Sequence, residues 1–400
     1  MRIATRVWFR GEFVGCRASR PVHLSRGFAL LQIPGPLAET ALSDEDVKIS
    51  EARLDDLAAD VQVSFRLQAD VLDGLKAACM ANRDIASFGV LGLTDAERPL
   101  TLVTLGSGPT VVSLVAGSHA DEPVGPETLR LFILRVLRER QRLDSLLERF
   151  TFLVFQHVNP DGESRNRPWI REWPNPAAYL RHAVREEPGQ DLEFGYPDLR
   201  RENELVARAL AQHAPIALHV SLHGMGFAEG GMLLIDPNWG YRTVELQNGY
   251  RVVLDEVGLG LHDHNRRGEK GFFYLGPGFS TTPSGTAMRS WFEAQGDVAT
   301  AALFRSSSME YVRSLGGDPL SLVTEVPLFA LTPSPKREPG VPATYLEWRE
   351  ALPSIRRKVA RGRSVDNELA AFFVEPVALH DAIRIQLRAI GLGLQAVSSS

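Results

Sequence analysis

A chain of 400 residues is long enough for one large α/β domain with additions, or for two domains. Its 44 basic and 49 acidic residues give a formal charge of -5, so no basic excess exists for binding nucleic acid or an anionic membrane. With 44% hydrophobic and 23% charged residues, the composition excludes disordered, collagen-like and coiled-coil proteins. The two cysteines, Cys16 and Cys79, form no Cys-x-x-Cys pair, and the charged first segment lacks a signal-peptide core, so we expect a cytoplasmic protein.

The first 85 residues carry no recognisable chemistry. Residues 6–16 have a strand-like pattern, and residues 61–83 have the periodicity of an amphipathic helix. We expect 1–85 to be a small α+β domain or an extension of the domain that follows.

From residue 86 to 335, apolar strand-like runs alternate with helical patterns. Strands are expected at 100–106 and 110–117, which we predict to be neighbours, and at 150–158, 216–224, 230–236 and 320–328. Helices are expected at 127–150, 200–214 and 243–258, and loops at 163–200 and 268–291. This alternation predicts a sheet with helices on both faces. A C-terminal helical segment, 336–400, is expected to pack on this domain through helices at 347–362 and 378–397.

A possible metal site begins with His119 and Glu122, which stand three residues apart directly after the strand 110–117. Such spacing is common by chance, but imidazole and carboxylate are ligands of catalytic zinc, which uses three protein ligands and leaves one position open. His223 closes the strand 216–224 and can supply the third ligand from a second strand end. His219 lies about 13 Å away along the same strand, and we interpret it as a packing residue.

The order of four motifs resembles that of the zinc carboxypeptidases. They are HADE at 119–122, NPDG at 159–162, LHG at 222–224 and TEVP at 324–327, and the resemblance covers about residues 85–330. It implies a three-layer α/β/α fold with a mixed, mostly parallel sheet. It also implies one zinc ion held by His119, Glu122 and His223.

The resemblance further assigns roles around that ion. Glu325 would act as general base and then general acid, taking a proton from zinc-activated water and returning it to the leaving amine. Asp191 matches the family aspartate that orients a zinc histidine, here His119. Arg167 or Arg171 would polarise the scissile carbonyl, and the spacing slightly favours Arg167.

The substrate side departs from the family pattern. The family's Asn-Arg pair, which holds a terminal carboxylate, falls on Glu193 and Phe194, and neither can bind an anion. We expect both to contact the substrate. Arg289 is expected to line the specificity pocket.

These expectations favour a zinc-dependent hydrolase that acts on a small peptide or an amino-acid conjugate. An aspartoacylase-like deacylase of N-acyl amino acids is an alternative, although that branch generally lacks the Asn-Pro-Asp-Gly turn at this place. An inactive metal-binding module on the same scaffold is a third, but it would have no reason to keep Glu325. The sequence leaves the oligomeric state open.

Overall fold

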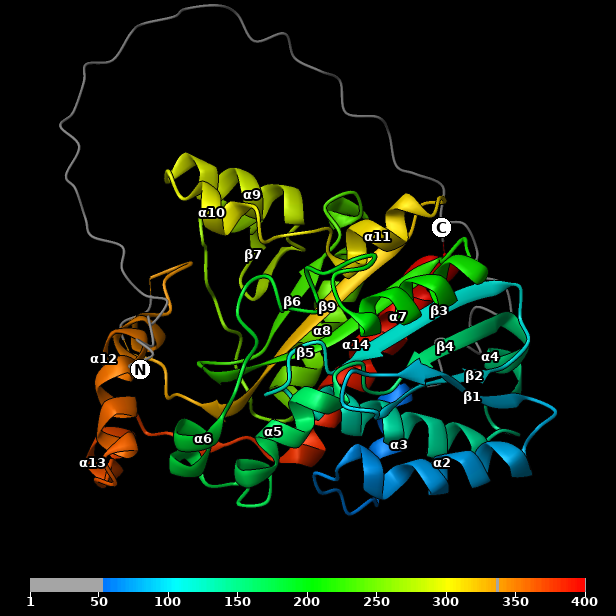
Figure 1. Ribbon diagram of the computed structural model, residues 1–400, viewed down its shortest axis with the longest axis horizontal. Helices are drawn as coiled ribbons and strands as arrows, with labels where there is room; N and C mark the ends of the chain where they lie inside the picture. Colours follow the sequence, from blue (N-terminus) through cyan, green and yellow to red (C-terminus); the bar gives the residue numbers. More distant parts are fainter. Residues whose placement is uncertain (1–52, 336–337, 400) are drawn as a thin grey trace, which may run out of the picture. The chain divides into compact units, whose positions relative to one another are not determined.

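The computed structural model describes residues 53–335 and 338–399, and its centre is a mixed ten-stranded sheet (Figure 1). The strand order is β1-β2-β4-β3-β5-β9-β6-β8-β7, and β10 pairs with β9. The strands are β1 (Ala86–Leu93), β2 (Pro99–Leu105), β3 (Thr110–Ala116), β4 (Phe150–Phe155), β5 (Leu218–Ala228), β6 (Met232–Ile235), β7 (Tyr274–Gly276), β8 (Phe279–Thr281), β9 (Leu320–Ala330) and β10 (Glu375–Pro376). The central strands β4, β3, β5 and β9 run parallel, while β2 and β6 pair antiparallel at their two sides.

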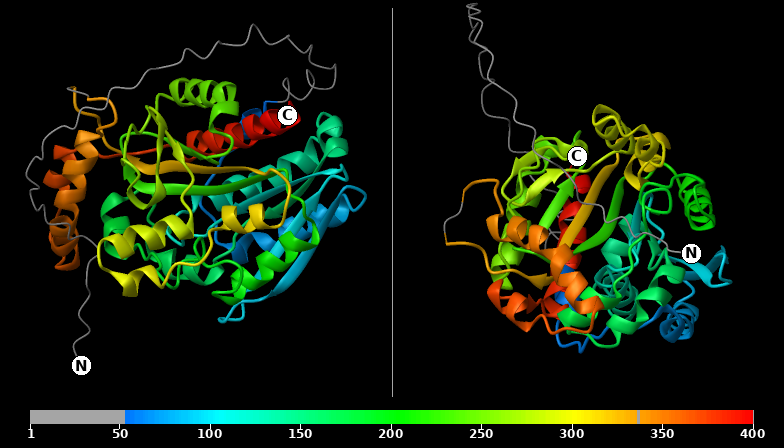
Figure 2. Two further views of the ribbon diagram at one scale, coloured as in Figure 1. Left: turned by 90° about the horizontal axis from the view of Figure 1, so that it is seen from above. Right: turned by 60° about the vertical axis from the view of Figure 1, so that its left-hand side comes forward.

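Helices cover both faces of this sheet. They are α2 (Gln68–Ala81), α3 (Val124–Arg138), α4 (Asp144–Arg149), α5 (Pro160–Ile170), α6 (Pro176–His182), α7 (Arg201–Gln212), α8 (Val244–Glu256), α9 (Gly285–Ala294), α10 (Val298–Ala301), α11 (Ser308–Ser314), α12 (Ala343–Ala360), α13 (Asp366–Ala371) and α14 (Leu379–Ser398). The left view of Figure 2 shows α8 and the red α14 on one side of the strands and the yellow α11 on the other. The three-layer α/β/α prediction with a mixed sheet is therefore confirmed.

The residues of β5 show how the sheet separates two environments. Leu218, Val220 and Leu222 belong to the main apolar core with α3 and α14. Side chains of a strand alternate between faces, so His219, Ser221 and His223 point to the opposite side, toward α7 and α11. Both faces of β5 are buried, and one of them is lined by polar groups.

The expected pairing of strands 100–106 and 110–117 is wrong, because β4 lies between β2 and β3. β3 and β4 are parallel, so the chain between them must cross over the sheet, and it does so through α3 and α4. The single helix expected at 127–150 is accordingly two helices. Pairing within a sheet depends on this crossover and not on the distance between strands along the chain.

Two expected loops also contain regular structure. Segment 163–200 holds most of α5 and all of α6, and both helices begin at an Asn-Pro pair. Asn159 and Asn175 cap them through their side-chain oxygens, and the following proline occupies the first turn, where its missing N–H is not needed. Segment 268–291 contains β7, β8 and the first part of α9.

The C-terminal helix α14 is tied to the centre of the sheet by Gln386. Its Oε1 accepts a 2.6 Å hydrogen bond from Thr128 of α3, and its Nε2 donates to the carbonyl of His223 at 3.1 Å. Helices near the expected positions 61–83, 347–362 and 378–397 are present as α2, α12 and α14. The strand-like segment 6–16 lies outside the described residues, and the predicted domain boundaries stay a prediction.

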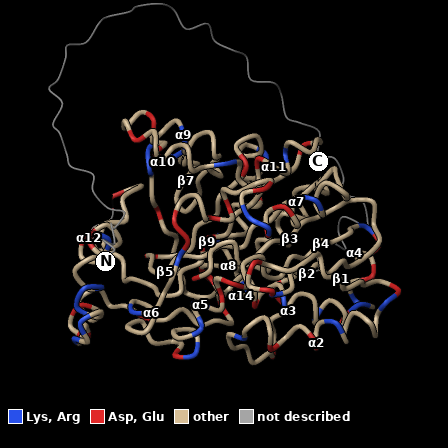
Figure 3. Tube along the Cα trace, viewed as in Figure 1, with Lys and Arg blue, Asp and Glu red and all other residues tan. Residues whose placement is uncertain are grey.

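Charged side chains of both signs are interspersed along the described trace (Figure 3). Among the residues described, no helix has the length and apolar content needed to cross a membrane.

Candidate metal centre

Three side chains converge where β3 ends. Ala116, the last residue of β3, is in register with Leu222, so β5 runs on past it and carries His223 beyond the end of β3. The loop after β3 brings His119 and Glu122 to the same place. Nδ1 of His223 lies 3.0 Å from Nδ1 of His119 and 3.0 Å from Oε2 of Glu122. Oε1 of Glu122 lies 3.0 Å from Nδ1 of His119, and one ligand atom of each residue falls within 4.8 Å of the others.

Each of the two histidines meets a carboxylate through its second nitrogen. Nε2 of His119 lies 3.4 Å from Asp191, and Nε2 of His223 lies 3.1 Å from Glu193. An ionised carboxylate only accepts hydrogen bonds, so each imidazole carries its proton on Nε2 and turns the lone pair of Nδ1 inward. The Nδ1 lone pairs of the two histidines and the carboxylate of Glu122 can together bind a cation. The donor types and spacing fit zinc, whose tetrahedral ligand atoms stand about 3.3 Å apart.

The two supporting carboxylates are held in their ionised form. Burial opposes ionisation of both, yet His119 next to Asp191 and His223 next to Glu193 hold the pKa of each carboxyl below its usual value.

Arg185, in the segment after α6, reaches the convergence point. Its Nη2 lies 2.6 Å from Nδ1 of His119 and also contacts Oε1 of Glu122. Its Nε lies 3.5 Å from Oδ1 of Asp121, whose other oxygen accepts a 3.0 Å hydrogen bond from Tyr179. A cationic group therefore lies next to these donor atoms.

Glu325 lies beside this group on the neighbouring strand. In the parallel pairing of β5 with β9, Glu325 is in register with His223, and both side chains therefore point to the same face. Burial raises the pKa of Glu325, while its electrostatic interactions with His223 and Arg185 work in the opposite direction. A buried carboxyl with a raised pKa is suited to general acid–base chemistry.

The start of α5 supports the loop that carries His119. A side chain at Gly162 would collide with Cβ of Ala120, so the loop packs directly on the helix start. The side-chain amide of Asn159 donates to Oε1 of Glu186 at 2.9 Å, next to Arg185 in sequence. The Asn-Pro-Asp-Gly segment thus serves as a helix cap and a packing surface.

A family model described as zinc carboxypeptidase matches residues 72–225. The match includes His119, Glu122, the segment 159–162 and His223. Over these residues the sequence is similar to the zinc carboxypeptidases. Among curated proteins, none matches the sequence at a significant level.

Several solved structures resemble this chain at low identity. Carboxypeptidase A from Helicoverpa armigera is 13% identical, with 89% of this chain and 81% of that chain covered and a TM-score of 0.49. Bovine thrombin-activatable fibrinolysis inhibitor, in complex with tick carboxypeptidase inhibitor, is 15% identical, with 75% and 98% covered and a TM-score of 0.43. A metallo-carboxypeptidase from Burkholderia cenocepacia is 15% identical, with 83% and 70% covered and a TM-score of 0.43. Because all three scores lie below 0.5, the fold assignment rests on the strand order of the sheet.

The two arginines expected to polarise a carbonyl lie on the exposed side of α5 and at its end. Arg167 is exposed on α5 and Arg171 is exposed at its end. Within 53–335 and 338–399, neither has a hydrogen bond or ion pair with His119, Glu122 or His223. Arg185 contacts His119 and Glu122, and the role expected of Arg167 or Arg171 stays a prediction. No strand end or motif marks Arg185 in the sequence, because it lies in an irregular segment after α6.

The residues expected to contact the substrate have other partners. Both oxygens of Glu193 are used inside the protein, by His223, Ser221 and Ser308, and its expected contact with the substrate stays a prediction. Phe194 is buried against Phe304.

Arg289 of α9 has partners within the protein, and its expected position in the specificity pocket stays a prediction. Its guanidinium donates to the carbonyl of Phe304 at 2.9 Å and to the hydroxyl of Thr286 at 2.9 Å, and so it joins α9 to the segment after α10.

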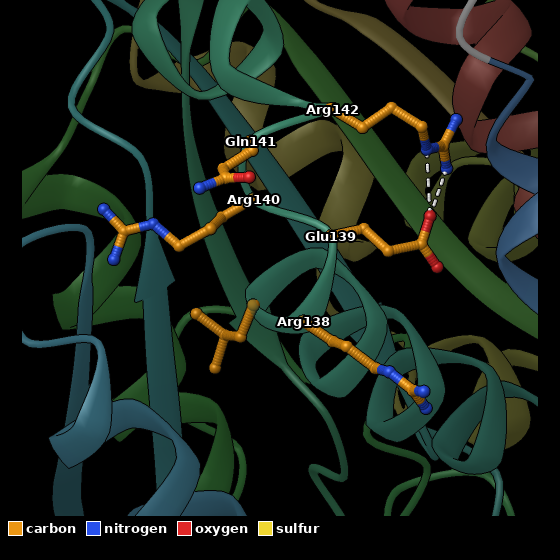
Figure 4. A pocket seen from close by; sticks show the side chains of 6 residues that line it. Arg138, Glu139, Arg140, Gln141 and Arg142 are labelled. Atoms are coloured by element: carbon orange, nitrogen blue, oxygen red, sulfur yellow. Dashed lines mark hydrogen bonds and ion pairs between the residues drawn. The ribbon is translucent and has the colours of Figure 1, made fainter.

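A hollow shown in Figure 4 lies at the far end of α3. It is lined by residues 137–142, and Glu139 pairs there with Arg142. Because α3 starts next to the metal group and rises 1.5 Å per residue, this hollow is about 20 Å from the candidate site.

Proposed function

We propose that this chain is a zinc-dependent hydrolase that cleaves a peptide or peptide-like amide bond. The observation that carries the proposal is the inward orientation of two Nδ1 lone pairs and one carboxylate, with Glu325 in register beside them. His119, Glu122 and His223 would hold the ion. A zinc ion bound there would polarise a carbonyl and lower the pKa of a water molecule to about 7.

Glu325 is the proton carrier in this proposal. Its raised pKa allows it to take a proton from water and to return it to the leaving amine. Arg185 donates to the carbonyl oxygen of the substrate as negative charge develops there. Asp191 and Glu193 keep the two imidazoles in the tautomer that binds a metal.

The substrate is proposed to be a small peptide or an amino-acid conjugate. Glu193 and Phe194 stand where the family binds a terminal carboxylate, and neither is a cation. We therefore expect amidated dipeptides to be cleaved as readily as free acids. The cytoplasmic location also stays a prediction.

The test begins with the zinc content of the purified protein and of His119→Ala, followed by assays on free, C-terminally amidated and N-acylated substrates. Zinc is expected in the parent protein and not in the variant. Hydrolysis of N-acyl amino acids alone would favour the deacylase, and bound zinc without any turnover would favour the inactive module.

Glu325→Gln tests the assigned proton transfer. We expect zinc to be retained and kcat to fall by about 10²- to 10⁴-fold, because the amide cannot accept the proton. Glu293→Gln, on the exposed surface of α9, is the matched control and should leave kcat unchanged. Full turnover in Glu325→Gln would show that another group moves the proton.

A further inference from the structure

A row of buried polar side chains connects the middle of the sheet with the candidate metal ligand His223. Ser113 of β3 is in register with His219 of β5, and its Oγ lies 2.6 Å from Nδ1 of His219. Nε2 of the same ring lies 3.0 Å from Oγ of Ser308, at the first residue of α11. All three side chains have no solvent exposure.

The row continues through Glu193. The backbone N–H of Ser308 donates to Oε1 of Glu193 at 3.1 Å, and its hydroxyl contacts the same oxygen. The other oxygen of Glu193 accepts from Ser221 at 3.2 Å and meets Nε2 of His223 at 3.1 Å. Four polar side chains therefore form a row that ends at Nε2 of His223: Ser113, His219, Ser308 and Glu193.

The direction of every hydrogen bond in this row is fixed. Glu193 is an ionised acceptor, so the hydroxyl of Ser308 gives its proton to Oε1. The oxygen of that hydroxyl can then only accept from His219, whose proton must be on Nε2. Burial lowers the pKa of His219 to about 4, so the ring is neutral and its Nδ1 accepts from Ser113.

We propose that His219 is a positioning residue for the metal centre, acting through Ser308 and Glu193 on the tautomer and orientation of His223. The role rests on the proposed zinc site. It replaces the packing role predicted for His219, since a ring that only filled space would not need both nitrogens bonded. Removing the Nε2–H donor frees Ser308 to turn away from Glu193, which then holds His223 less firmly.

Two serines on the strands flanking His219 provide a matched pair of variants. Ser113 and Ser321 are both in register with His219, from β3 and β9, and both are fully buried. Only Ser113 bonds to the ring; Oγ of Ser321 has no hydrogen-bond partner among the described residues. Ser113→Ala should therefore weaken zinc binding, and Ser321→Ala should not.

The experiment measures the zinc dissociation constant by chelator competition in the parent, in both serine variants, and in His219→Phe and His219→Gln. We expect His219→Phe to bind zinc about 10-fold more weakly, at the lower end of the range for outer supports of a ligand. His219→Gln, which keeps a donor and an acceptor, should recover most of this loss. Nitrogen NMR of the zinc-free parent should place the proton of His219 on Nε2.

The outcomes separate this inference from the proposed function. A parent protein that binds no zinc overturns the proposed function and this inference with it. Tight zinc binding in the parent and equally tight binding in His219→Phe overturn the inference alone. If His219→Phe does not fold, two other results overturn the inference. One is equal zinc affinity in Ser113→Ala and Ser321→Ala. The other is a proton on Nδ1 of His219 in the parent protein.

Discussion

Arg185 contributes a guanidinium at the place where two imidazoles and a carboxylate meet. Arg185→Gln should lower kcat by about 10²- to 10³-fold, the usual loss when one donor to a developing oxyanion is removed, with little change in KM. Arg171→Gln, at the exposed end of α5, is the matched control and should have no effect. Steady-state kinetics on one dipeptide measure kcat and KM for both variants. A lower kcat in Arg171→Gln together with an unchanged kcat in Arg185→Gln would show that an arginine of α5 polarises the carbonyl.

Glu193 has hydrogen-bond partners that its position in the motif does not indicate. Glu193→Gln replaces an ionised acceptor by a neutral amide, so we expect zinc affinity to fall by about 10-fold or more while KM for dipeptides with a free carboxylate is unchanged. Chelator competition and kinetics measure the two effects separately, with exposed Glu187→Gln as the control. A large change in KM with normal zinc affinity would mean that Glu193 contacts substrate after all.

The candidate metal ligands could be predicted from the sequence because their donors and spacing are local. His119 and Glu122 share one loop, and His223 closes an apolar run. Arg185 and the partners of Glu193 could not be predicted, because hydrogen bonds between distant segments depend on the packing of α6 and α11 against the sheet. The backbone between such residues carries no periodic signal.

At the scale of elements, α3 approaches the strands of the site through a glycine. A Cβ at Gly125 would lie 2.6 Å from the carbonyl oxygen of Leu222 and 3.1 Å from Cβ of Ala116. Gly125→Ala should therefore push α3 away from β3 and β5, and we expect it to lower the free energy of unfolding by about 1–3 kcal/mol. Urea denaturation measures the change.

Gly74 of α2 is the control for this substitution. It is exposed, and a Cβ there would meet no atom within 4 Å. Gly74→Ala should raise the free energy of unfolding by about 0.5–1 kcal/mol, because alanine loses less conformational freedom in a helix. Equal effects at the two positions would contradict the close approach of α3.

The periodicity of β3, β5, β9 and α14 was sufficient to predict them as elements, and each is found near its expected bounds. Their neighbours in the sheet were not predictable in the same way. β4 separates β2 from β3 because a crossover through α3 and α4 returns it there, and apolar residues alone do not encode which edge a returning strand will join.

Across the described chain, four histidines are held neutral mainly by burial. Burial lowers the pKa to about 4 for His157, His219 and His264, and to about 3 for His262. The unfolded chain takes up protons at these sites below its ordinary pKa of about 6.5, whereas the folded chain does not. The free energy of unfolding should thus be unaffected above pH 6.5 and should fall as the pH drops from 6.5 toward 4.

His262→Phe tests this acid sensitivity. The ring is 1% exposed, and its Nδ1 has no hydrogen-bond partner within the described residues. Removing its titration should reduce the slope of unfolding free energy against pH by about 1.4 kcal/mol per pH unit in the lower part of that range. Urea denaturation at several pH values measures the slope. The same slope in the parent and the variant would show that His262 is not held neutral.

The sequence by itself determined the order of strands and helices along the chain, the candidate ligands His119, Glu122 and His223, and the position of Glu325 near the end of a strand. These follow from local spacing and from hydrophobic periodicity, which operate over a few residues. Only the tertiary structure decided that β4 enters between β2 and β3, that Arg185 and not a residue of α5 reaches the centre, and that Glu193 supports His223. Each of these depends on contacts between segments far apart in the chain, which form only when the sheet and its two helical layers are packed together.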